Sequence, residues 1–133
     1  MKYLLDTNVC VTFLNQRKPM LSKRFLATAT SDKVICSVVR AELFYGAYKS
    51  QHQPGSLLTI ESFLSGYPNL DFDQMASRIY GEIRADLERK GTPIGPHDLQ
   101  IASIAHAYSL TLVTHNTSEF CRVQNLLPED WES

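Results

Sequence analysis

Short apolar runs alternate with helical segments along this chain, and few folds accommodate that order. The runs at residues 2–5, 33–36, 68–72 and 111–114 have the length and composition of strands. Strands that alternate with helices form βαβ units, in which the crossovers are right-handed and the strands are parallel. We therefore predict an α/β fold, an α/β/α sandwich whose central sheet is mostly parallel and has about four to five short strands.

Capping residues and apolar spacing predict the helices between these runs. They are expected at residues 9–14, 19–30, 38–49, 56–64, 74–90 and 97–108, with Pro54 and Gly55 ending the third of them. The helix after Asp73 is the most regular, because apolar residues repeat at every fourth position: Met75, Ile79, Ile83 and Leu87. The helix at 97–108 is rich in alanine and isoleucine and has few charges. We expect it to be central and buried.

Length and composition indicate one compact domain over residues 1–133. The chain has 133 residues, 44% hydrophobic and 20% charged, which is enough for one substantial core. No stretch approaches the roughly 20 apolar residues of a membrane span, and the start of the chain meets a charge too early for a secretory signal. The three cysteines, Cys10, Cys36 and Cys121, form no CxxC pair. We expect a cytoplasmic protein with three buried thiols.

The charge balance limits how the chain could bind nucleic acid. A net charge of −1 excludes binding by bulk electrostatics, so any contact with a phosphate backbone must be local. Two groups of basic residues could make such a contact: Arg17 and Lys18 with Lys23 and Arg24, and Arg84 with Arg89 and Lys90. A solvated helix face is the alternative for each group.

Four segments place an acidic or amide side chain beside an apolar run, at Asp6, Glu42, Asp98 and Asn116. Asp6 and Asn116 follow predicted strands, so both are expected at the carboxyl edge of the sheet, where α/β folds bind ligands. Glu42 and Asp98 lie early in helices that start from the same edge. Carboxylates gathered there would tolerate one another only around a hard divalent cation. This predicts a Mg²⁺ site that Mn²⁺ could also occupy.

Each of these residues also has an ordinary structural role. Asp6 can cap the following helix, and Asp98 can interact with the dipole of its own helix. Asn116 can occupy a turn, and Glu42 can pair with a basic residue of its own helix. The common location favours a site, because four separate structural roles would otherwise have to coincide at one edge.

The residue types favour phosphodiester hydrolysis over other chemistry. Mg²⁺ and Mn²⁺ take oxygen ligands, and a bound ion of this kind can activate water for attack on phosphorus. Zinc is less suitable, because the four histidines show no ligand spacing and are expected in loops or at the surface. The chain has neither a Ser/His/Asp signature nor a GxxxxGK[ST] loop, which argues against acyl transfer and P-loop nucleotide hydrolysis.

The same motifs resemble those of PIN-domain endoribonucleases, and specifically the VapC-type toxins of bacterial toxin–antitoxin pairs. The resemblance covers nearly the whole chain, over residues 3–8, 38–47, 94–102, 112–120 and 123–131. It implies that Asp6, Glu42 and Asp98 are catalytic, metal-binding carboxylates. Asn116 would be a catalytic residue at a position that the family fills with Asp or Asn, and Glu119 a possible helper.

The resemblance also implies partners and a substrate. It predicts a homodimer and a VapB-type antitoxin that blocks the active site and brings the complex to operator DNA. The expected activity is Mg²⁺-dependent cleavage of structured RNA, with the anticodon stem-loop of initiator tRNA as the favoured target, leaving a 3′-hydroxyl and a 5′-phosphate and inhibiting translation. The sequence departs from the family pattern at two positions that bear on the metal site. His97 precedes Asp98 where Asn is common, and Asn116 has one negative charge fewer than the Asp found in the fully acidic version.

Three other functions fit parts of the sequence. A metal-dependent DNA nuclease would use the same acidic pocket. A phospho-acceptor receiver module would need a second acid beside Asp6 and a lysine near the last strand, but no lysine follows Lys90. An inactive interaction protein held by its antitoxin would not need Asp6, Glu42 and Asp98 intact.

Overall fold

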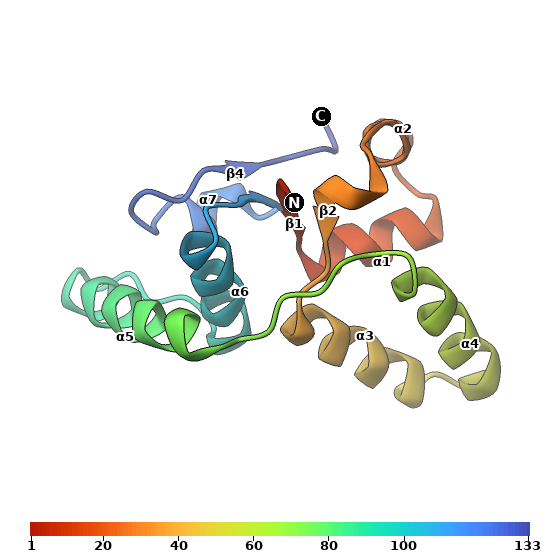
Figure 1. The fold of residues 1–133 in the computed structure, drawn as a ribbon, viewed down its shortest axis with the longest axis horizontal. Coiled ribbons are helices and arrows are strands. Elements are labelled where there is room, and N and C mark those ends of the chain that lie inside the picture. The colour runs from red at the N-terminus through yellow and green to blue at the C-terminus, as the bar shows by residue number, and fades with distance from the viewer.

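The computed structural model describes residues 1–133 as an α/β fold with a four-stranded sheet (Figure 1). In chain order the elements are β1 (Tyr3–Leu5), α1 (Thr7–Asn15), α2 (Pro19–Ala27), a 3₁₀ turn (Thr30–Asp32), β2 (Lys33–Val34), α3 (Ser37–Lys49), α4 (Gln53–Leu64), α5 (Gln74–Arg89), α6 (Pro96–Ala107), β3 (Thr111–Val113), α7 (Thr117–Phe120) and β4 (Pro128–Glu129). None of the helices combines the length and apolar composition needed to cross a membrane.

The sheet has the order β2-β1-β3-β4, and every neighbouring pair is parallel. Leu4 pairs with Val34 on one side and with Leu112 on the other. The chain moves from β1 outward to β2 and then returns to the opposite side of β1 to form β3. The strand order therefore reverses between β1 and β3, and the carboxyl edge at such a reversal is where α/β folds usually bind ligands. The prediction of an α/β fold with a mostly parallel sheet is confirmed.

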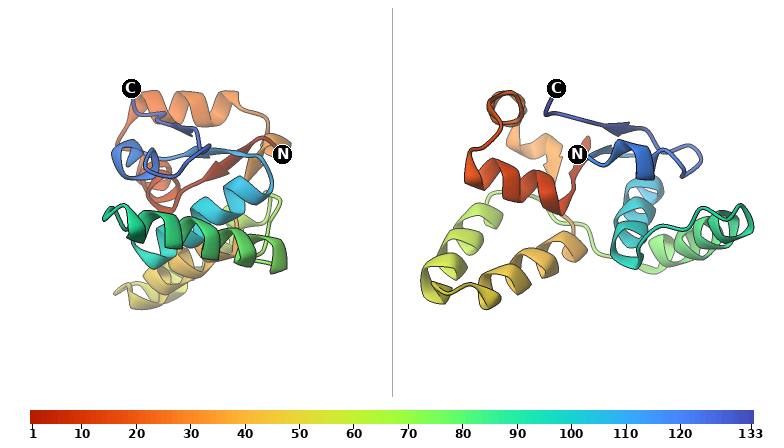
Figure 2. Two further views of the ribbon diagram at one scale, coloured as in Figure 1. Left: turned by 90° about the vertical axis from the view of Figure 1, so that its left-hand side faces the viewer. Right: turned by 180° about the vertical axis from the view of Figure 1, so that it is seen from behind.

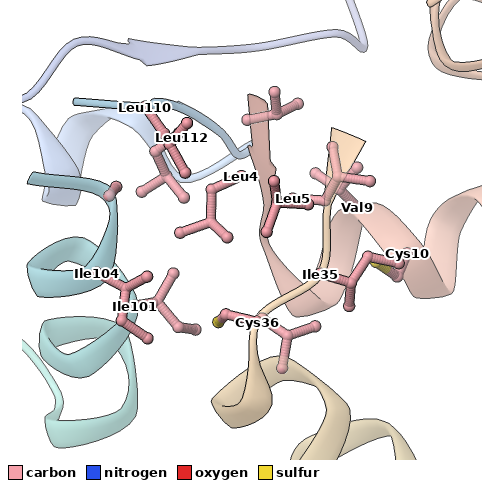
Figure 3. Packing of buried hydrophobic residues seen from close by; sticks show 14 of the residues in the cluster. Leu4, Leu5, Val9, Cys10, Ile35, Cys36, Ile101, Ile104, Leu110 and Leu112 are labelled. Carbon is pink, nitrogen blue, oxygen red and sulfur yellow. The ribbon is translucent and has the colours of Figure 1, made fainter. Parts of the chain in front are cut away.

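The core lies between this sheet and the helices, with α6 at its centre. Figure 3 shows Leu4 and Leu112 of the sheet near Ile101 and Ile104 of α6, all four fully buried. The residues from Leu99 to Ala105, with the exception of Gln100, are buried on α6. This agrees with the low charge of the segment, since a helix that is apolar on most sides is stable only when surrounded by protein.

Two helix pairs extend from the sheet in different directions (Figures 1 and 2). The helices α3 and α4 pack against each other, as do α5 and α6. The helix α3 also contacts α1 and α6, so it connects the two helix pairs to each other. The amino ends of α1, α3 and α6 are thereby brought toward one edge of the sheet.

The predicted strand at 68–72 is wrong. The segment is irregular and makes only two backbone–backbone hydrogen bonds with the residues that follow β2, from the Ile35 amide to the Pro68 carbonyl at 3.1 Å and from the Ser37 amide to the Leu70 carbonyl at 2.9 Å. Pro68 has no N–H, and the Arg40 side chain donates to the neighbouring Tyr67 carbonyl at 3.0 Å. The fourth strand is instead β4, in the tail that resembles the family's last strand.

Three local expectations also differ from the structure. Pro54 and Gly55 do not break a helix but lie in the first turn of α4, where proline needs no hydrogen-bond partner for its nitrogen. Met75 is half exposed, and the core-facing side of α5 is formed by Ala76 and Leu87 with the partly buried Ile83. Cys121 is exposed, whereas the other two thiols are buried as expected.

Lys33 is a buried lysine without an acidic partner, and its replacement tests the cost of that charge. The side chain is only 3% exposed, donates to the Phe25 carbonyl at 2.6 Å and lies over the Phe25 ring at 4.0 Å from its centroid. Burial lowers the Lys33 pKa below its usual 10.5. Since the unfolded chain then binds this proton more tightly, the stability of the protein should rise with pH toward 10.5.

We expect Lys33→Met to stabilise the protein by about 1 kcal/mol at pH 7, because methionine fills the space without burying a charge. Urea unfolding at several pH values measures the effect, and the gap from wild type should narrow toward pH 10. Lys23→Met, at an exposed position, is the control. A less stable Lys33→Met protein would mean that the lysine contacts outweigh the cost of burial.

Candidate active site

Asp6 is fixed at the end of β1 by hydrogen bonds to both of its carboxylate oxygens. Oδ1 accepts from the Thr7 amide at 2.8 Å, and Oδ2 accepts from the Thr114 hydroxyl at 2.8 Å. The residue is only 5% exposed, and burial raises its pKa despite these two donors. Asp6 is therefore the N-cap of α1, as the structural alternative proposed, and also a buried carboxylate shared between β1 and the residue after β3.

Glu42 is directed toward the start of α1. Its Oε1 accepts from the Thr7 hydroxyl at 2.7 Å, and its Oε2 lies 3.6 Å from Nδ1 of His97. Pairing with a basic residue of the same helix is not observed, because the Arg40 side chain donates to the backbone carbonyl of Ile35 at 2.7 Å. The carboxylate thus joins the groups at the carboxyl edge of the sheet.

Asp98 lies in the first turn of α6 and has the most perturbed carboxyl group of the four segments. Its pKa is raised to about 6, first by burial and then by the charges of Asp6, Glu119 and Glu42, while a hydrogen bond with the Glu119 carboxyl also favours its protonated form. A helix N-terminus normally favours the ionised acid, so a dipole role alone does not explain this environment. Asp98 and Glu119 form a pair of neighbouring carboxyls.

Asn116 connects the end of β3 to this pair. Its side-chain amide donates to Oε2 of Glu119 at 3.0 Å, and its backbone amide donates to the Thr114 hydroxyl at 3.0 Å. Its backbone φ is −90°, so it does not occupy the left-handed turn conformation considered as the alternative. The residue instead orients Glu119.

Two threonines complete the arrangement, although no role was predicted for either. Thr7 links Glu42 to the first turn of α1, and Thr114 links Asp6 to the backbone of Asn116. Their positions in the sequence could have indicated a role: Thr7 directly follows the capping acid Asp6, and Thr114 is the last residue of a predicted strand. Hydroxyl donors at such positions favour the ionised form of a neighbouring carboxylate.

The donor set fits a hard divalent cation. The side chains offer carboxylate and amide oxygens, and no lysine or arginine forms an ion pair with any of the four acids. Burial, and after it the charges of neighbouring acids, raises the pKa of both Asp6 and Asp98. A cation that prefers oxygen ligands would relieve this repulsion.

A tighter convergence of possible ligands occurs beside this site, at His115, Asp130 and Glu132, whose ligand atoms all lie within 4.8 Å of one another. His115 Nδ1 is 3.1 Å from Asp130 and 3.5 Å from Glu132. Sequence spacing did not predict this group, because it joins the turn after β3 to the tail. It holds that turn, and with it Asn116, against the C-terminal residues.

Each predicted basic group is paired with acids only in part, since Arg17, Lys23 and Arg89 form no ion pair. Lys18 pairs with Glu132 and Arg24 with Glu129, at 3.8 and 2.5 Å. On α5, Arg84 pairs with Glu88 at 3.1 Å. The remaining pair, Lys90 with Asp86, is also spaced four residues along the chain, at 3.0 Å. These contacts are exposed or half-exposed, and acids accompany the bases in both groups.

Comparison with known proteins places this geometry in a family. The PIN domain pattern matches residues 3–126. The chain is 42% identical over 131 residues to the tRNA(fMet)-specific endonuclease VapC of Shigella flexneri, covering 98% of both chains. It is 41% identical over 133 residues to ribonuclease VapC2 of Rickettsia felis, covering 99% of both. The crystal structure of DNA-bound VapBC from Salmonella typhimurium aligns with a TM-score of 0.92 at 40% identity, covering 98% of each chain.

Proposed function

The chain belongs to the PIN-domain family, and within it to the VapC-type ribonucleases, and we propose on this basis that it is the toxin of a type II toxin–antitoxin system. As such it would be a cytoplasmic, Mg²⁺-dependent, site-specific endoribonuclease that arrests growth by inhibiting translation. The observation that carries the proposal is the gathering of Asp6, Glu42, Asp98 and Glu119 at the edge where the strand order reverses.

Asp6, Glu42 and Asp98 would hold the cation, with Asn116 and Glu119 as helpers. When bound, Mg²⁺ or Mn²⁺ supplies Lewis-acid activation of water and neutralises charge on the phosphate. The protein's part is to hold its ligands in place: Thr114 donates to Asp6, and Thr7 donates to Glu42. Asn116 fixes Glu119, whose carboxyl can share a proton with Asp98. These contacts orient the acids before the substrate arrives, which reduces the reorganisation needed for the reaction.

The favoured substrate is the anticodon stem-loop of initiator tRNA. The relative from Shigella flexneri carries tRNA(fMet) specificity in its name, and the two chains match over almost their whole lengths. In-line attack on the phosphodiester would leave a 3′-hydroxyl and a 5′-phosphate. Single-stranded loops are the parts of structured RNA whose bases are accessible to a protein.

The expected partners are a second copy of the chain and a VapB-type antitoxin that also binds operator DNA. Support comes from the structural relatives, which are toxin–antitoxin complexes and include complexes bound to DNA. A groove of about 590 Å³ between α1, α3 and α4 begins at Thr7 and Glu42 and includes the apolar residues Val11, Leu43 and Ile60. An antitoxin segment in this groove would reach the acidic site and block it.

The test is incubation of the antitoxin-free protein with total tRNA and with DNA of matched sequence, in Mg²⁺ and in EDTA, followed by sequencing of the cleavage ends. We expect one discrete cut in tRNA that requires Mg²⁺ and leaves a 5′-phosphate. Cleavage of DNA with RNA intact would favour the DNA nuclease alternative, and the absence of any cut with either divalent ion would favour the inactive interaction protein.

A further inference from the structure

A second pocket adjoins the acidic site and meets the groove between α1, α3 and α4 at Thr7 and Glu42. Its volume is about 550 Å³, and it lies between α3 and α6, lined by Thr7, Ser37, Glu42, Tyr45, His97 and Gln100 together with Val38 and Ala41. We name it the α3–α6 pocket. It shares Thr7 and Glu42 with the acidic site, so a group bound in the pocket lies next to one bound at the acids.

The lining combines one exposed aromatic ring with several polar side chains. Tyr45 is 66% exposed, although a large aromatic side chain is usually covered in a folded protein. Gln100 and His97, at the start of α6, lie across the pocket and can donate and accept hydrogen bonds. Proteins hold an unstacked nucleobase in two ways: an aromatic ring stacks on the face of the base, and polar side chains form hydrogen bonds with its edge.

The charge distribution gives a reason for such a pocket. The net charge is −1, and Lys18, Arg24 and Arg84 pair with acids of the same chain while Arg17, Lys23 and Arg89 do not, so electrostatic attraction of RNA would be local. One basic group lies close to a lining residue, although it does not itself line the pocket: Nζ of Lys49 is 5.7 Å from the centroid of the Tyr45 ring. Stacking of a base on the Tyr45 ring would then add affinity to the local contacts between basic residues and the RNA phosphates.

We propose that the α3–α6 pocket binds one unpaired RNA base next to the scissile phosphate, that Tyr45 stacks on this base and that Gln100 reads its edge. The inference rests on the proposed ribonuclease function and adds to it a determinant of substrate choice. A base held there places the adjoining phosphate beside Glu42, because the pocket and the acidic site meet at that residue.

The test compares kcat/KM of the full-length, antitoxin-free protein on a short hairpin that wild type cleaves. Tyr45→Ala should lower kcat/KM by about ten- to one-hundred-fold, the range of aromatic stacking on one base, and Tyr45→Phe should retain most of it. Tyr48→Ala is the matched control, since Tyr48 is 60% exposed on the same helix but does not line the pocket. Gln100→Ala should broaden the base preference at one position of the substrate.

Hairpins with single abasic positions around the cut identify the base concerned. At one position, base removal should slow wild type by the same factor as Tyr45→Ala, and the two changes together should cost no more than either alone. The inference is overturned if the factors multiply at every position, if Tyr45→Ala behaves like Tyr48→Ala, or if light scattering shows that Tyr45→Ala changes the oligomeric mass. Failure of wild type to cut any RNA would instead reject the proposed function itself, and the base pocket with it.

Discussion

Asp98→Asn should reduce RNA cleavage by about three orders of magnitude, because it removes one charge from the group of acids that would hold the cation. The same substitution should make the metal-free protein more stable. Both effects would have one origin: the Asp98 carboxylate is half-buried and lies among Asp6, Glu119 and Glu42, so its ionised form is unfavourable unless a cation is bound beside it. Asparagine keeps the shape of the side chain and does not ionise.

The direction of the stability change follows from the raised pKa. Asp98 has a pKa of about 6 in the folded protein against 3.8 for the ordinary group, so the folded state binds its proton more tightly. In EDTA, stability should therefore fall as pH rises from about 4 to about 6, and this loss is complete at neutral pH. The full difference corresponds to about 3 kcal/mol, which solvent screening at a half-buried site reduces to roughly 1–2 kcal/mol.

Thermal unfolding in EDTA at pH 7.5 measures this gain, which corresponds to a rise of roughly 3–8 °C in Tm. At pH 4 the difference from wild type should nearly disappear. Asp71→Asn, at an exposed position away from the site, is the control for both activity and stability. A folded Asp98→Asn protein that still cleaves RNA at the wild-type rate would rule out Asp98 as a required ligand, and a lowered Tm would show that its carboxylate is already compensated.

Much of the fold was predictable because strong local signals coincide with the long-range arrangement. Asp73 caps α5 by accepting a hydrogen bond from the Ala76 amide, and Gly91 follows the helix at a φ of +70°, as a glycine stop does. The low charge of α6 likewise predicted its central position. The strand prediction for residues 68–72 was wrong because the composition of the segment resembles a strand, whereas its carbonyls accept from Ile35, Ser37 and Arg40 through tertiary contacts.

The candidate site was only partly predictable, since a sequence indicates the acids but not their hydrogen-bond partners. Asp6 and Asn116 could be placed at one edge from strand ends alone. The link from Thr7 to Glu42 spans 35 positions in sequence, and the link from Thr114 to Asp6 spans 108. Such contacts arise from packing of α1 on α3 and pairing of β1 with β3, which periodicity does not specify.

Thr114→Val should destabilise the protein by about 2–4 kcal/mol, although valine has nearly the same shape. Thr114 is fully buried, its hydroxyl donates to Asp6 at 2.8 Å, and the same oxygen accepts from the Asn116 amide at 3.0 Å. Valine would leave a buried carboxylate short of one donor and an amide without its acceptor. Urea unfolding in EDTA at pH 7.5 gives the loss directly.

The pH dependence separates this role from simple packing. The Thr114 hydrogen bond lowers the pKa of Asp6 against the effect of burial, so it stabilises the ionised carboxylate in particular. The destabilisation by valine should therefore shrink as the pH falls and Asp6 takes up a proton. Thr114→Ser, which keeps the hydroxyl, should cost only about 1 kcal/mol for the lost methyl group and show no such pH dependence. Equal losses for serine and valine at every pH would mean that Thr114 acts by filling space, and that Asp6 is held by the Thr7 amide alone.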